Sequence, residues 1–159
     1  MQNCELNFEP YPFYIVSTVV ATILTAFWEE LYFRYVGCSL FEEENGKYRW
    51  YNVIFMALMF MMIHLINIAF NGLDATVTQL IFTFGLGIFC LALYIETKSL
   101  LVPIIAHFCI NSVADFFTLY SSNTPAYVGD LQDPILYLDV IIMIVISIYI
   151  LKKGNHLIR

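Results

Sequence analysis

Long apolar stretches separated by short polar joints dominate this 159-residue chain. Five stretches can be followed, and each is close to the ~20 residues that a helix needs to cross ~30 Å of hydrocarbon. They cover residues 11–34, 51–71, 77–97, 100–120 and 134–151. The pattern predicts an all-α fold, a polytopic membrane bundle of about five transmembrane helices.

The basic residues indicate how these spans are oriented. With five crossings, all seven Lys and Arg residues fall on one side, at Arg34, in the joints 35–50 and 96–99, and in the C-terminal tail. Cytoplasmic loops of membrane proteins carry an excess of Lys and Arg. We therefore expect the N-terminus outside and the C-terminus in the cytoplasm, in a multi-pass protein of the plasma (cytoplasmic) membrane. The acidic start Met1–Glu5 does not resemble a cleavable signal peptide.

The composition supports lipid as the solvent. Hydrophobic residues make up 60% of the chain and charged residues 13%, whereas a soluble domain is about half apolar and about a quarter charged. We expect a single membrane domain over residues 1–159. The net charge of -6 reflects acidic residues near segment ends, so no basic surface for nucleic acid is expected. Four cysteines without C-x-x-C spacing predict free thiols rather than a disulfide or zinc framework: Cys4, Cys38, Cys90 and Cys109.

Three fragments place ionisable or strongly polar side chains inside these apolar segments. Such groups are expensive in lipid, so a membrane protein that carries several of them usually uses them. The fragments come from the first, second and fourth segments. Their polar and flanking residues are Glu29, Glu30 and Arg34, then Phe60 and His64, then His107 and Asn111.

Spacing separates the roles of the two adjacent glutamates. Glu30 and Arg34 are four residues apart, so they share a helical face and can form an ion pair. Glu29 is rotated by ~100° from Glu30, so it can point elsewhere and act as a general base. With Arg34 at the cytoplasmic interface, a rise of ~1.5 Å per residue puts Glu29 ~8 Å inside. The alternative is that both glutamates are interfacial residues at a helix end.

The histidines complete a candidate catalytic set. His64 lies on the same face as Phe60, although a single histidine on an apolar helix can also be an ordinary core residue. His107 and Asn111 are four residues apart, and two donors on one face can hold a developing oxyanion. Asp115 continues that face by a turn and is expected to serve helix packing.

A metal site is the alternative use of the same residues. Glu29, His64 and His107 form a credible three-ligand set for catalytic zinc, with water in the fourth position. They come from three separate helices without H-E-x-x-H spacing. Water activation by Glu29 and His64 without metal explains the same residues, so the expected cofactor is either none or Zn. No motif supports a serine or cysteine nucleophile.

The fragments, in this order, resemble the CPBP intramembrane protease family, also called Abi or the CAAX protease and bacteriocin-processing family. Its pattern is E-E-x-x-x-R, then F-x-x-x-H, then H-x-x-x-N/D, and residues 20–120 carry the resemblance. The resemblance to type II CAAX prenyl endopeptidases implies that Glu29 and His64 activate water and that His107 and Asn111 form the oxyanion site. Glu30, Arg34 and Phe60 would support them.

The resemblance also implies the partners. The expected substrate is a peptide or protein at the bilayer, with a prenylated CAAX C-terminus or a peptide precursor as candidates. The chain has only one segment before its first motif, where relatives commonly have more, so a homodimer is one way to complete the cleft. Two alternatives stay open: a non-catalytic bacteriocin-immunity or partner-binding protein of the same fold, and a small transporter or proton relay.

Overall fold

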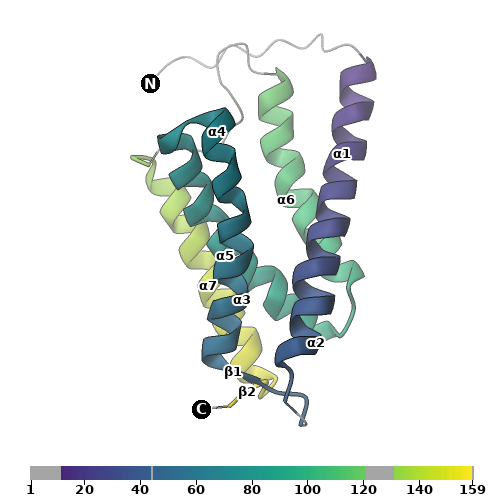
Figure 1. Ribbon diagram of the computed structural model, residues 1–159, viewed down its shortest axis with the longest axis vertical. Coiled ribbons are helices and arrows are strands. Elements are labelled where there is room, and N and C mark those ends of the chain that lie inside the picture. Colours follow the sequence, from purple (N-terminus) through teal and green to yellow (C-terminus); the bar gives the residue numbers. More distant parts are fainter. Residues whose placement is uncertain (1–11, 44, 121–130, 159) are drawn as a thin grey trace.

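Helices form nearly all of the computed structural model, which describes residues 12–43, 45–120 and 131–158 (Figure 1). Five long helical stretches follow one another along the chain. Their elements are α1 (Pro12–Glu30), η1 (Leu31–Val36) and α2 (Gly37–Phe41), then α3 (Trp50–Ile63), η2 (His64–Asn67) and α4 (Ile68–Asn71), then α5 (Leu73–Thr97), α6 (Leu101–Tyr120) and α7 (Pro134–Lys153). The predicted all-α fold is confirmed.

The outer surface is apolar, as a bilayer requires. Among the described residues, four helical stretches are long and apolar enough to cross a membrane: Pro12–Phe41, Trp50–Asn71, Leu73–Thr97 and Pro134–Lys153. Large side chains such as Phe27, Trp28 and Ile141 point outward from them. The chain is therefore a multi-pass membrane protein, and four of the five predicted spans meet these criteria. The orientation of the spans stays a prediction.

Helix α5 is the centre of the bundle. It packs against α3, α6 and α7, while α1 packs mainly against α6. Figure 1 shows α1 and α6 as one pair, beside a group formed by α3, α5 and α7. Small residues of α5 permit close approach: a Cβ atom added at Gly87 would lie 3.2 Å from Phe60 and 3.4 Å from Ala57. Membrane helices commonly pack through such small residues.

The first helical stretch extends further than the sequence predicted. The expected end at residue 34 is wrong, because the chain stays helical through a π-helical turn to Phe41. Cys38 belongs to a buried apolar cluster with Met56 and Leu91, and Phe41 packs against that cluster. This apolar contact favours helix in the first part of the predicted joint 35–50. Glu29 lies ~18 Å from the end of this helical stretch at ~1.5 Å per residue, and its depth below the membrane interface stays a prediction.

A short two-stranded parallel sheet joins two segments at one end of the bundle. Strand β1 (Tyr48–Arg49) pairs in parallel with β2 (Leu157–Ile158), which follows α7. His156 Nε2 lies 2.7 Å from Glu96 Oε2 at the end of α5. Tyr48 is fully buried, and this burial raises the pKa of its hydroxyl. The contacts tie the C-terminal tail to the first joint and to α5.

Cys38, Cys90 and Cys109 are free thiols, and the first two are buried. The expectation of no disulfide holds for these three, while Cys4 lies outside the described residues. Cys90 packs in a second apolar cluster with Phe60, Leu86 and Met143.

The Gly87 contact gives a test of the packing. A Gly87→Leu substitution should lower the free energy of unfolding by about 1–3 kcal/mol, because the new side chain collides with α3. Thermal unfolding in detergent would measure the change. Ala69→Leu, at an exposed position of α4, is the matched control and should change stability little. Equal effects of the two substitutions would contradict the close packing of α5 on α3.

Candidate active site

A buried ionic cluster joins the first and fourth predicted segments. Arg34 Nε lies 2.8 Å from Glu30 Oε2, so the ion pair that the i, i+4 spacing predicted is present. The other oxygen, Glu30 Oε1, lies 2.8 Å from Nδ1 of His107 on α6. All three side chains are at most 2% exposed. Glu30 therefore bridges a cation on its own helix and a histidine on another, and the second contact was not predicted from the sequence.

An aromatic ring from α3 covers this cluster. The guanidinium carbon of Arg34 lies 4.5 Å from the centre of the fully buried Phe60 ring. The Arg34–Glu30 contact is close but not well aligned as a hydrogen bond, so the ring face offers the cation additional stabilisation. Phe60 also makes edge-on contacts with His64 and His107. One side chain thus packs against both histidines and the arginine.

The hydrogen bonds fix which ring nitrogens carry protons. His64 Nδ1 lies 3.0 Å from the carbonyl oxygen of Phe60, and a carbonyl can only accept, so Nδ1 donates. In the neutral ring, Nε2 of His64 is then left as an acceptor. His107 Nδ1 likewise donates to the carboxylate of Glu30. Its Nε2 lies 3.7 Å from Glu29 Oε2.

Glu29 differs from its neighbour in having little to bind. Its buried Oε2 atom has no hydrogen-bond partner among the described residues and lies 3.7 Å from His107 Nε2. The two oxygens of Glu30, in contrast, lie 2.8 Å from Arg34 and from His107. The Glu29 side chain is 20% exposed, against none for Glu30. The ~100° rotation between neighbouring helix positions accounts for the difference. One carboxylate is used within the bundle, and the other remains available to a molecule entering from outside.

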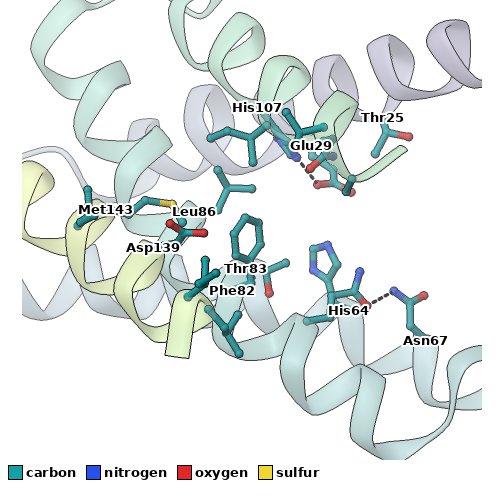
Figure 2. A pocket seen from close by; sticks show the side chains of 18 of the residues that line it. Thr25, Glu29, His64, Asn67, Phe82, Thr83, Leu86, His107, Asp139 and Met143 are labelled. Carbon is teal, nitrogen blue, oxygen red and sulfur yellow. Dashed lines mark hydrogen bonds and ion pairs between the residues drawn. The ribbon is translucent and has the colours of Figure 1, made fainter. Parts of the chain in front are cut away.

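A cavity of about 630 Å³ brings the candidate residues together. Figure 2 shows Glu29 and His107 on one side and His64 facing them from the other. Thr25 lies on the same wall as Glu29. The four predicted catalytic residues all line this cavity: Glu29, His64, His107 and Asn111. Phe60, Glu30 and Arg34 lie behind the wall and hold it.

Sequence reasoning missed several polar residues of the cavity. Gln79 of α5 accepts a hydrogen bond of 2.8 Å from Asn67, beside His64. Asp139 of α7 also lines the cavity, and its place inside an apolar run was the signal that could have found it. Asp115 accepts a hydrogen bond from Thr22 of α1, which agrees with the predicted packing role.

The donor geometry bears on the zinc alternative. Within residues 12–43, 45–120 and 131–158, no group of three or more His, Cys, Asp or Glu side chains is arranged to hold a metal ion. His107 uses Nδ1 to bind Glu30, and its Nε2 lies 3.7 Å from Glu29. Glu29, His64 and His107 are not arranged to hold a metal ion in this conformation, and their role as zinc ligands stays a prediction.

Comparison with known families identifies the class of protein. Residues 11–113, more than half of the chain, match the family described as type II CAAX prenyl endopeptidase Rce1-like. The chain therefore belongs to this family of intramembrane proteases, as the three motifs predicted. No curated protein and no solved structure matches the chain. Helix α7 lies beyond the matched residues.

The buried ion pair should contribute strongly to stability. Glu30→Gln and Arg34→Met should each lower the free energy of unfolding by roughly 3–5 kcal/mol, because each leaves an uncompensated buried charge. The double variant should lose less than the sum. Denaturation in detergent would measure all three variants.

An exposed pair of the same chemistry is the matched control. Arg49 Nε lies 2.7 Å from Glu43 Oε1, with both side chains more than a third exposed. Glu43→Gln and Arg49→Met should each change stability little, because solvent screens an exposed ion pair. Similar losses at the buried and exposed pairs would contradict the importance of burial.

Proposed function

We propose that this protein is an intramembrane endopeptidase that hydrolyses peptide bonds with water activated by Glu29 and His64. The observation that carries the proposal is the buried Glu29 Oε2 atom, which has no hydrogen-bond partner among the described residues and borders the cavity. A carboxylate in this state is a strong proton acceptor for a water molecule. Membership of a protease family supports the same reaction class.

The different contacts of the two glutamates support Glu29 as the general base. Glu30 is engaged by Arg34 and His107, so a proton taken up there would break two buried contacts. Glu29 can accept a proton without such a loss. His64, with Nδ1 bound to the Phe60 carbonyl, offers Nε2 as a second acceptor across the cavity. A water molecule has two protons, and two acceptors can orient its lone pair toward a carbonyl carbon.

The charges around His107 support its role as an oxyanion donor. With Nδ1 bound to Glu30, its Nε2 can donate a hydrogen bond only when the ring is protonated. Glu29 and Glu30 flank the ring, so they would balance that positive charge. Asn111 lies one turn further along α6 and lines the same cavity. Its amide can donate a second hydrogen bond to the oxyanion.

These residues account for every proton in the proposed reaction. Water oxygen attacks the peptide carbonyl carbon while Glu29 takes one water proton. The carbonyl oxygen becomes an oxyanion, which His107 and Asn111 stabilise. Glu29 then passes its proton to the leaving nitrogen, the carbon–nitrogen bond breaks, and a carboxylic acid and an amine leave.

The family and the apolar surroundings favour a substrate held at the bilayer. We propose a protein or peptide with a prenylated CAAX-type C-terminus, or a peptide precursor, as the substrate class. We also propose the plasma membrane as the location, with the N-terminus outside and the C-terminus in the cytoplasm.

Glu29→Gln is the direct test. The substitution should reduce kcat by roughly 10²–10⁴-fold, because it removes the proton acceptor, while thermal stability changes little. Both proteins would be purified in detergent and incubated with a fluorogenic prenylated CAAX peptide and its unprenylated twin. Asp74→Asn, an exposed carboxylate of α5 outside the cavity, is the matched control.

Cleavage that persists in Glu29→Gln would exclude Glu29 as the base. A folded wild type that cleaves neither peptide would favour the non-catalytic immunity or partner-binding alternative. The comparison between the twins reports whether the prenyl group is needed.

Metal removal tests whether the proposed hydrolysis proceeds without a metal ion. Dialysis of the purified enzyme against a strong chelator should leave the cleavage rate unchanged, because the proposed base and oxyanion donors are side chains. The rate and the zinc content would be measured before and after dialysis. A loss of activity that added zinc restores would overturn the metal-free mechanism.

A further inference from the structure

Asp139 occupies the cavity face of α7. The α7 residues that line the cavity recur every three to four positions, as one face of a helix requires. They are Ile135, Leu136, Asp139, Ile142 and Met143. Figure 2 places Asp139 on the opposite side of the cavity from His64 and near Met143. An acidic side chain thus stands in the middle of an otherwise apolar wall, in a helix beyond the matched residues 11–113.

This carboxylate is not used to hold the bundle together. Among the described residues, Asp139 forms no hydrogen bond or ion pair. Two other aspartates of the described residues differ in this respect. Asp133 accepts a 2.9 Å hydrogen bond from the backbone of Ile135 and caps α7, and Asp115 binds Thr22. An intramembrane carboxylate without a structural partner is expensive, and such residues commonly line substrate or ion pathways.

Negative charge is in excess in the cavity. Its lining carboxylates are Glu29, Asp133 and Asp139, which outnumber the single positive charge of a protonated His107, and no Lys or Arg among the described residues lines it. Arg34 cannot offset them, because it is buried against Glu30 behind the wall. A low-dielectric cleft of one sign concentrates ligands of the opposite sign. The cavity therefore favours a cation over a neutral or acidic group.

We infer that Asp139 is a specificity-determining residue that binds a Lys or Arg side chain of the peptide substrate. The inference rests on the proposed function, because it assigns the cavity to a peptide. Lys and Arg carry an apolar stem and a charged end. The stem would pack against the apolar α7 residues beside Asp139, such as Leu136 and Met143, and the charged end would pair with the carboxylate. Such a contact would set which peptide bond of the substrate lies at Glu29 and His64.

Matched peptides would test this assignment. The peptides would be N-acetylated, prenylated and of CAAX type. Each would carry Lys, norleucine or Glu at a single position, and positions on both sides of the scissile bond would be varied in turn. Acetylation removes the terminal amine, so the Lys side chain is the cation tested. The kcat/KM values would be compared for the wild type, Asp139→Asn, Asp139→Lys and the control Asp74→Asn.

The wild type and Asp74→Asn should prefer Lys over norleucine at one position. Asp139→Asn should lose roughly ten- to hundredfold in kcat/KM on the Lys peptide, as expected for a hydrogen bond to a charged group. It should cleave the norleucine peptide as before. Asp139→Lys should prefer Glu at that position. An equal Lys-to-norleucine ratio in the wild type and Asp139→Asn would overturn the inference.

Peptide binding separates this inference from the proposed function. Fluorescence anisotropy would measure the affinity of the same peptides for Glu29→Gln, with and without Asp139→Asn. If the wild type cleaves none of the peptides, the proposed function fails, and the binding measurements alone decide whether Asp139 recognises Lys. Tighter binding of the Lys peptide that disappears with Asp139→Asn supports the inference, and equal binding of both peptides rejects it.

Discussion

The bridge formed by the Glu30 carboxylate is the interaction on which the site depends. One oxygen neutralises Arg34 and the other holds His107, and both contacts are 2.8 Å long inside the bundle. A buried charge in a membrane protein is tolerated only where it is paired. By binding both partners, Glu30 fixes α6 against α1 and sets the orientation of the His107 ring. Phe60 then packs against Arg34 and His107 and brings α3 to the same point.

Backbone irregularities occur where the site residues lie. The α-helix of the first stretch changes to a π-helical turn directly after Glu30, and the second stretch changes to a 3-10 turn at His64. Such local changes in winding are frequent at functional sites. Here they alter the direction in which side chains leave the helix without interrupting a membrane-spanning segment.

Sequence reasoning succeeded where the answer depends on spacing within one helix. Apolar length gave the five helical stretches, and the i, i+4 rule gave the Glu30–Arg34 pair. It failed at the end of the first stretch, because Cys38 packs in a buried apolar cluster with residues far along the chain, which a local pattern does not show. It also missed the Glu30–His107 contact and Asp139. Contacts between helices depend on how each helix is rotated, which is set by close packing such as that at Gly87.

The two adjacent glutamates show why a site of this kind can exist in lipid at all. A general base must keep an accessible lone pair, yet a buried carboxylate without partners weakens the fold. In the proposed mechanism the chain divides these demands between Glu30, which contacts Arg34 and His107, and Glu29, which borders the cavity. A helix turns by ~100° per residue, so neighbouring side chains face different surroundings. The proposed mechanism thereby assigns stability and chemistry to separate carboxylates in one turn of helix.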